Sequence, residues 1–440
     1  MGLDRREFLG AAGASAAAVA AATATDSAAA QPAATFPTGF LWGAATAAHQ
    51  IEGNNVSSDL WLVENVKPTM FREPSGDACN SFNLWPTDLD LARDMGLNAY
   101  RFSIEWARIE PEPGFFSPAM LDHYQAVIDG CRARGLKPLV TFSHFSAPRW
   151  FAASGGWTNP EAPDLFARYC DRAARRLAAN MGAAVTLNEP NMITVVGEVL
   201  PPQMTGLVRE MNAAAGRACG STNFKNAMLP EVADIPTAQT HMIAAHKAGR
   251  AAIKAARGDL PVGVSLTMSD DQAVGENSVR DAKRAQFYGP WLEAAKADDF
   301  LGVQNYARAQ WNDKGQVPPP KGAKLNGMGA EIYPPSLAGA VRYAHAATGV
   351  PILVTEHGLS TGDDAQRAAF IPAALAGLQK AVAEGVPVQG YIHWSLIDNF
   401  EWVFGYSQHF GLHSVDRATF KRTAKPSAAV LAAIARRNAV

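Results

Sequence analysis

Short apolar runs with β-strand character alternate with helix-like stretches along almost the whole chain. Strands separated by helices pair in parallel through crossover connections, and eight such units close into a (β/α)8 barrel. The sequence therefore predicts an α/β protein whose residues 34–440 form a single TIM-barrel domain. The eight predicted strands are Phe40–Ala45, Ala99–Ile104, Pro138–His144, Ala184–Asn188, Val262–Met268, Phe300–Tyr306, Ile352–Glu356 and Gln389–Ser395.

The intervals between these runs differ in character. Amphipathic spacing predicts helices over Phe166–Met181 and Thr237–Arg257. Pro-rich and Asn/Gly-rich pieces at 317–321 and 324–329 predict a long loop after the sixth strand. The interval Pro201–Pro236 lacks clear periodicity, and we expect it to form a rim over the barrel mouth. No composition break indicates a second domain.

Two of the buried runs end in a carboxylate. Glu189 closes A-A-V-T-L-N-E-P, where Pro190 has no N–H to continue the strand ladder, and Glu356 closes P-I-L-V-T-E-H-G. Either glutamate alone could simply point to solvent. As a pair at the same ends of the fourth and seventh strands, they are expected to face each other across the mouth where such barrels carry their chemistry.

Two facing carboxyl groups are the minimal equipment for glycoside hydrolysis, one as a proton donor and one as a nucleophile or base. The two groups then need different pKa values. Asn188 and the apolar strand favour a protonated Glu189, whereas Arg101, at the end of the second strand, is the cation expected to keep Glu356 ionised. A structural ion pair between Arg101 and Glu356 is compatible with that role.

The sequence resembles family 1 of the glycoside hydrolases, the β-glucosidase type of retaining enzyme on a (β/α)8 barrel. The resemblance runs from Phe36 to about Ala429. It is carried by F-L-W-G-A-A-T-A-A-H-Q-I-E-G from Phe40, T-L-N-E-P, T-E-H-G, and W-S-L-I-D-N-F-E-W from Trp394. Each motif is short, but their order and spacing together are highly specific.

Position by position, the resemblance implies that Glu189 is the acid/base, Glu356 the nucleophile and Tyr306 its hydrogen-bond partner. It implies that Asn188 binds the sugar 2-hydroxyl, and that the terminal sugar is held by Gln50, His144, Trp394, Glu401 and Trp402. Amide and carboxylate groups suit vicinal hydroxyls, and an indole suits the apolar face of a pyranose. Family members that act on phosphorylated sugars tend to lose the Glu-Trp pair, so its presence implies an unphosphorylated sugar.

The chain also departs from the family pattern. His357 and Gln304 stand where asparagine is usual, Ser146 replaces an aspartate, and Asn80-Ser81-Phe82 replaces Asp-His-Tyr. None of these changes removes a carboxylate, so the expected reaction type stands. They leave the identity of the glycone and aglycone open.

Composition limits the possible partners. A formal net charge of −2 argues against nucleic acid or an anionic membrane as a partner. The four cysteines form no C-x-x-C pair, no histidine cluster has metal-ligand spacing, and no phosphate loop or dinucleotide fingerprint is present. We expect buried free thiols, no metal, no cofactor, and a β-linked glycoside as the partner; the oligomeric state is not indicated.

The N-terminus has the layout of an export signal. Arg5-Arg6 precede Phe8-Leu9 and an Ala-rich stretch that ends in small residues near Ala30, which resembles a twin-arginine signal. We predict a signal peptide over residues 1–33 and a periplasmic or secreted protein. A basic leader or an uncleaved anchor is the alternative, although the apolar part is short for a transmembrane helix.

Three functional hypotheses follow. The first is a retaining β-glycosidase that cleaves a terminal sugar by double displacement. The second is a transglycosylase that uses the same two glutamates, and the third is a sugar-binding protein without turnover. The carboxylate pair weighs against the third hypothesis, but the sequence does not separate the first two.

Overall fold

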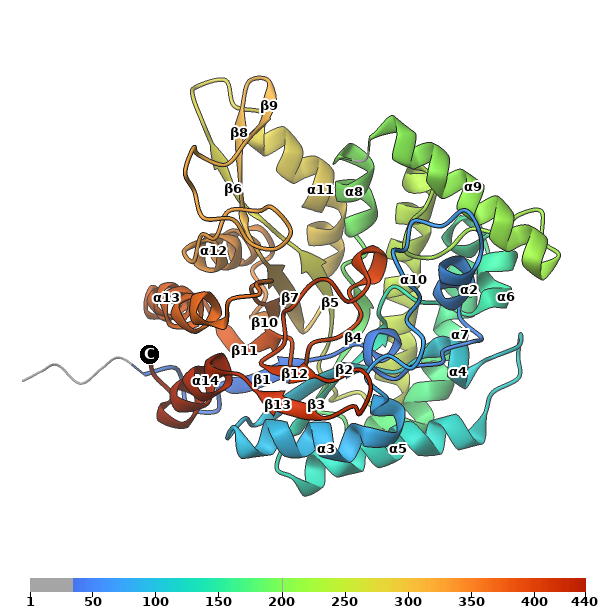
Figure 1. Cartoon of the computed structure of the whole chain (residues 1–440), viewed down its shortest axis with the longest axis horizontal. Helices are drawn as coiled ribbons and strands as arrows, with labels where there is room; N and C mark the ends of the chain where they lie inside the picture. The colour runs from blue at the N-terminus through green and yellow to red at the C-terminus, as the bar shows by residue number, and fades with distance from the viewer. Residues whose placement is uncertain (1–34, 200) are drawn as a thin grey trace, which may run out of the picture. The chain divides into compact units, whose positions relative to one another are not determined.

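A computed structural model describes residues 35–199 and 201–440. The predicted export signal lies outside these residues. Eight strands form one closed parallel barrel in the order β1-β11-β10-β7-β5-β4-β3-β2 (Figure 1). The strands are β1 (Leu41–Ala45), β2 (Ala99–Ser103), β3 (Lys137–Ser143), β4 (Ala183–Asn188), β5 (Val262–Thr267), β7 (Phe300–Asn305), β10 (Ile352–His357) and β11 (Val388–Trp394).

Each barrel strand is followed by a long helix that covers the outside of the barrel (Figure 1). These eight helices are α3 (Ser81–Asp94), α5 (Pro118–Ala133), α7 (Ala162–Leu177), α10 (Ile235–Ala256), α11 (Arg280–Ala295), α12 (Ser336–Thr348), α13 (Asp364–Ala383) and α14 (Pro426–Arg437). Local chemistry sets several of their ends. Ser117 caps α5 by accepting a hydrogen bond from the Met120 amide, and Gly349 ends α12 in the left-handed conformation.

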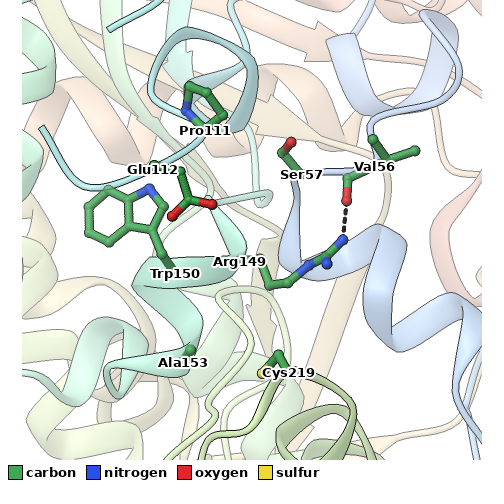
Figure 2. A pocket seen from close by; sticks show the side chains of 8 residues that line it. All are labelled: Val56, Ser57, Pro111, Glu112, Arg149, Trp150, Ala153 and Cys219. Carbon is green, nitrogen blue, oxygen red and sulfur yellow. Dashed lines mark hydrogen bonds between the residues drawn. The ribbon is translucent and has the colours of Figure 1, made fainter. Parts of the chain in front are cut away.

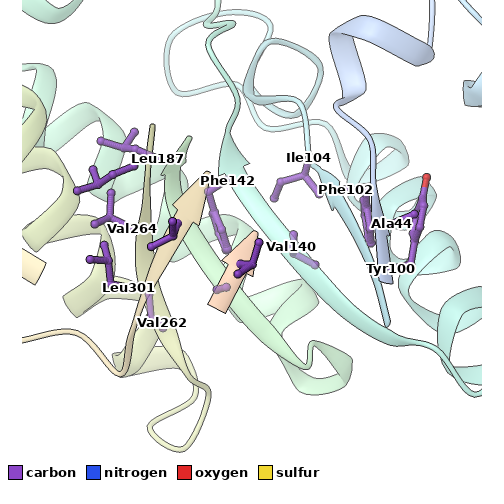
Figure 3. Close-up of a cluster of buried hydrophobic side chains, with 14 of the residues drawn as sticks. Ala44, Tyr100, Phe102, Ile104, Val140, Phe142, Leu187, Val262, Val264 and Leu301 are labelled. Carbon is purple, nitrogen blue, oxygen red and sulfur yellow. The ribbon is translucent and has the colours of Figure 1, made fainter. Parts of the chain in front are cut away.

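The hydrophobic core has two layers. Between the barrel and its helices lies the large cluster of Figure 3, to which β3 contributes Val140 and Phe142, β4 contributes Leu187, and β5 contributes Val264. The barrel interior holds a separate cluster in which Leu139 and other aliphatic side chains pack with aromatic residues such as Phe300. Strand residues therefore alternate between two buried environments, which explains why the strands are apolar on both faces.

The connections at the carboxyl ends of the strands carry further elements, in addition to short 3-10 helices. Six are short or moderate helices: α1 (Ala48–Ile51), α2 (Asp59–Asn65), α4 (Trp106–Ile109), α6 (Arg149–Ala153), α8 (Met192–Val199) and α9 (Pro202–Cys219). The others are a three-stranded sheet of β6 (Asp270–Ala273), β8 (Arg308–Asn312) and β9 (Gly315–Val317), and a hairpin of β12 (His413–Val415) and β13 (Arg422–Ala424).

Two sequence expectations change here. The interval 201–236, predicted without periodic structure, contains the 18-residue helix α9, which packs against α2. The small strands β6, β8 and β9 were also not predicted. The long loop expected after the sixth strand is present over residues 318–335, which contain no helix or strand. Cys79, Cys131, Cys170 and Cys219 are free thiols, and the first three are buried, as expected. Within the part of the chain that the structure describes, none of the helices combines the length and apolar character needed to cross a bilayer.

Candidate active site

The two strand-end glutamates lie in one site at the mouth of the barrel. Glu189 directly follows β4, and Glu356 is the next-to-last residue of β10. Both are almost fully buried, with exposed fractions of 6% and 4%. The predicted juxtaposition of the two carboxyl groups is therefore what the fold produces, because parallel barrel strands end at the same edge.

Glu356 accepts hydrogen bonds on both of its oxygens. Arg101 Nη1 donates to Oε1 at 2.6 Å, and the Tyr306 hydroxyl donates to Oε2 at 2.6 Å. The expected ion pair with Arg101 is present, and the guanidinium is fully buried. Arg101 Nη2 also donates to Asn188 Oδ1 at 2.6 Å, so one guanidinium links the ends of β4 and β10. These two donors stabilise the ionised form of Glu356.

The main neighbouring charge raises the pKa of one carboxyl group and lowers the pKa of the other. Burial raises the pKa of Glu189 well above its usual range, and the nearby charge of Glu356 raises it further, against smaller opposing effects from Thr267 and Arg101. Burial also raises the pKa of Glu356, but there the Arg101 charge and the Tyr306 hydrogen bond lower it. Glu356 is therefore the member of the pair that ionises first, and Glu189 is the member that keeps its proton.

A short polar network holds Glu189 in place. The Glu189 amide donates to Ser265 O of β5 at 2.8 Å. Asn191 then clamps the end of β5, because its side chain donates to Thr267 O at 2.8 Å and accepts from the Thr267 amide at 3.1 Å. The strand end of β5 therefore fixes the turn that carries the acid.

The five expected sugar contacts lie next to the carboxyl pair. Gln50 Nε2 donates to Phe400 O at 2.7 Å and to Glu401 Oε2 at 3.3 Å. Burial and the charge of Glu356 raise the pKa of Glu401 to about 8, against hydrogen bonds from Gln50 and Trp394. The His144 ring stacks on Trp394 at 5.7 Å and on Trp402 at 6.0 Å between centroids.

These contacts supply polar groups beside an aromatic wall, which is the combination that a pyranose ring requires. His144 belongs to that wall as a neutral ring, because burial and the Arg101 charge lower its pKa well below the usual value. Contacts connect nine of the ten residues predicted for the site, and Glu189, next to Asn188 in the chain, interacts with them through the charge of Glu356.

The family departures have structural explanations. His357 points away from the site: its ring stacks on Phe370, and its Nδ1 is 3.0 Å from the Tyr391 hydroxyl. Ser146 donates to the buried carboxylate of Glu105 at 2.8 Å. Gln304, by contrast, reaches into the site and donates to Asn188 Oδ1 at 2.7 Å.

Sequence reasoning missed three contributors to the site: Gln304, Thr267 and Asn191. From the sequence, Gln304 stands out only as a departure from the family pattern. The positions of Thr267 and Asn191 in the sequence could have indicated a role in the site. Thr267 is at the end of the fifth strand, and Asn191 directly follows Asn-Glu-Pro. Their hydrogen bonds, however, depend on the register of neighbouring strands.

A cavity of about 590 Å³ is lined by residues from the connections that follow β1, β2, β3 and β4 (Figure 2). Arg149 donates to Val56 O across this cavity, and Glu112 and Trp150 line it. Neither Glu189 nor Glu356 lines it, so it is distinct from the carboxylate site. Among the described residues, no three His, Cys, Asp or Glu side chains form a set that could hold a metal ion.

The fold and the site together define a (β/α)8 enzyme that works with a buried carboxylate pair. Comparison with known proteins agrees. The profile of glycosyl hydrolase family 1 matches residues 32–215 and 293–440. β-Glucosidase A of Thermotoga maritima is 30% identical over 437 residues, covering 89% of this chain and 96% of that protein. A β-glucosidase of Agrobacterium sp. is 30% identical over 461 residues, covering 92% and 96%.

A solved structure gives the same result. The apo structure of a β-glucosidase designated 1317 superposes with a TM-score of 0.87 at 42% identity, covering 90% of this chain and 98% of that one. The chain belongs to glycosyl hydrolase family 1. It is a retaining β-glycosidase.

Proposed function

We propose that this enzyme hydrolyses the terminal O-glycosidic bond of unphosphorylated β-glycosides, with Glu356 as the nucleophile and Glu189 as the acid/base. The observation that carries the assignment is the asymmetry of the carboxyl pair. Glu356 receives both the Arg101 guanidinium and the Tyr306 hydroxyl, whereas burial and the charge of Glu356 keep Glu189 protonated.

The first step breaks the bond between the anomeric carbon and the leaving oxygen. The Glu189 carboxyl transfers its proton to that oxygen while a Glu356 carboxylate oxygen forms a bond to the anomeric carbon. Glu189 is then ionised. Because Glu356 has lost its negative charge in the ester, the pKa of Glu189 falls, which suits its next task.

The second step reverses the roles. The Glu189 carboxylate takes a proton from water, the water oxygen attacks the anomeric carbon, and Glu356 leaves as a carboxylate that Arg101 and Tyr306 again stabilise. Two inversions at the same carbon give net retention. Tyr306 remains a donor throughout, because burial and the Glu356 charge raise its pKa well above the usual range.

For the glycone we propose β-D-glucose or a close epimer. The named relatives are β-glucosidases, and the pocket pairs the Gln50 amide with the Glu401 carboxyl, a set suited to adjacent hydroxyls. Arg101 is the only cationic side chain among the ten site residues, and it is engaged by Glu356 and Asn188. No charge is therefore provided there for a sugar phosphate, which supports an unphosphorylated substrate.

The assignment is tested by two matched variants, Glu356→Gly and Glu189→Gly, with an aryl β-glycoside that has a good leaving group. Glu356→Gly should lower kcat by at least about 1,000-fold. Added azide should restore cleavage by entering the vacated space below the ring and should give an α-glycosyl azide.

Glu189→Gly should instead form the glycosyl-enzyme and then yield a β-glycosyl azide. Proton NMR of the azide products separates the two outcomes. Exchanged configurations would mean that the two roles are reversed, and no rescue in either folded variant would refute the assignment.

We also propose that the protein is exported, on the strength of Arg5-Arg6 and the Ala-rich stretch after them. When residues 1–440 are expressed in a bacterium with twin-arginine export, the protein should be found in the periplasm or medium. Its N-terminus should then lie near residue 33, because the signal has been removed. The Arg5→Lys, Arg6→Lys double variant should stay inside the cell at full length. Cell fractionation and mass spectrometry measure where each protein is found and at what length. If the double variant is distributed like the wild type, export by this route is contradicted.

A further inference from the structure

The Asn188 amide is held in one orientation by two donors. Its Oδ1 accepts from Arg101 Nη2 at 2.6 Å and from Gln304 Nε2 at 2.7 Å. A side-chain amide oxygen has two acceptor sites, so both are occupied. The Asn188 Nδ2 is buried and has no hydrogen-bond partner among the described residues. The two donors therefore turn the amide so that its N–H groups are the part left for a ligand.

Gln304 is placed to do this and makes no other hydrogen bond through its side chain among the described residues. It lies on β7, fully buried, and β5 stands between β7 and β4 in the barrel. Two strand spacings correspond to about 9 to 10 Å along the sheet. A glutamine extends one methylene further than an asparagine, and that length lets the Gln304 amide pass over β5 to Asn188.

Arg101 also helps to orient the Asn188 amide, but it is bound to the nucleophile at the same time. Its other terminal nitrogen is committed to Glu356 Oε1 and Thr355 O. When the charge on Glu356 changes during the reaction, the position of the guanidinium is subject to change as well. Gln304 is neutral, so its hold on Asn188 is independent of the charge on the nucleophile.

We propose that Gln304 is a positioning residue for the sugar 2-hydroxyl, acting through Asn188. By occupying one acceptor site of Oδ1, it keeps Nδ2 directed at the 2-hydroxyl, a contact that strengthens in the transition state of glycoside cleavage. The proposal rests on the proposed function, in which Asn188 contacts that hydroxyl.

The test compares an aryl β-glucoside with its 2-deoxy analogue, which lacks the hydroxyl. Gln304→Met keeps the volume and removes the donor. It should lower kcat/KM for the glucoside by about 10- to 100-fold, the loss expected from one strong hydrogen bond. For the 2-deoxy substrate the change should stay within about 3-fold, because the contact is absent there.

A double variant gives a second criterion. Gln304→Met added to Asn188→Ala should cost no more on the glucoside than Asn188→Ala alone, since Gln304 acts through Asn188. Gln304→Glu should be worse than Gln304→Met, because its carboxylate repels Oδ1 and attracts Nδ2 away from the sugar. Equal losses on both substrates, or additive losses in the double variant, would overturn the proposal.

Asn305→Ala is the matched control. Asn305 is the next residue on β7, but its side chain binds Met268 O and Ala307 O and not Asn188. Any loss it causes should be the same for the two substrates. If the wild-type enzyme cleaved no aryl β-glycoside, the proposed function would fail; an active wild type with uniform losses in Gln304→Met would refute this inference alone.

Discussion

Two residues of the site and Phe145, which follows His144, have backbone conformations that non-glycine residues rarely adopt. Phe145, Glu189 and Trp402 have φ of 69°, 44° and 50°. A left-handed residue costs about 1 to 3 kcal/mol and persists only where the surrounding structure imposes it. Here the surroundings do so: Glu189 is tied to Ser265 and Phe145 packs edge-on against Trp402 at 5.3 Å. For Phe145 and Glu189 the left-handed residue follows a strand end directly or after one residue, where the chain turns at the mouth of the barrel.

Thr267 adjusts the pKa of the acid. Its hydrogen bond lowers the pKa of Glu189, because it stabilises the carboxylate. Thr267→Val removes that bond and should raise the pKa further. Activity requires protonated Glu189 and is lost as pH rises through this pKa, so the alkaline limb of the kcat/KM profile should move to higher pH. The limb is measured with an aryl β-glycoside; a shift to lower pH would contradict this role.

The acid limb provides the internal control. It reports ionisation of Glu356, whose direct partners are Arg101 and Tyr306 and not Thr267. Thr267→Val should therefore leave the acid limb nearly in place. A parallel movement of both limbs would indicate a general change in the site rather than the loss of one hydrogen bond.

Much of the site was predictable from the sequence because it consists of side chains at strand ends. Once Glu189 and Glu356 are placed on the fourth and seventh strands, the barrel brings them together. Arg101 follows from the same logic, since an ionised carboxyl in that position needs a cation. Gln304 and Thr267 act through side-chain hydrogen bonds whose partners are set by strand register, and no local pattern encodes that register.

At the scale of elements, the eight barrel strands were predicted to within one residue at each end. The reason is physical: a strand buried on both faces reads as a continuous apolar run, and the helices between strands read as amphipathic or polar. β10, with Ile352, Leu353 and Val354 before Thr355, is such a run. Parallel pairing and closure then follow from the number of units.

The elements that were missed lack such a signal. α9 has a buried side made largely of small residues, with Met211 and Ala215 packed on Leu60 and Val63 of α2. Its helical state depends on that long-range contact, which the sequence of the helix alone does not predict. β6 reads Asp-Asp-Gln-Ala and gains its strand conformation by pairing with β8. Tertiary contacts decide both elements.

At the scale of the molecule, residues from the two ends of the described chain complete the barrel together. β1 pairs with β11 on one side and with β2 on the other. Near the amino end of β1, Asn438 after α14 accepts from Trp42 Nε1 at 2.9 Å and donates to Phe36 O at 2.6 Å. The catalytic mouth is at the opposite ends of the strands. This contact should therefore affect the stability of the barrel and not its activity.

Asn438 should therefore be important for stability and not for turnover. Asn438→Gly keeps the left-handed backbone, φ 54°, but leaves the Trp42 indole N–H and Phe36 O without their partner, at a cost of about 1 to 3 kcal/mol. Asn438→Ala adds about 1 kcal/mol more for an alanine in that conformation. Thermal unfolding should rank the wild type above Asn438→Gly and Asn438→Ala lowest, while kcat/KM well below the transition is unchanged. Equal Tm values for all three proteins would show that the two chain ends do not close the barrel cooperatively.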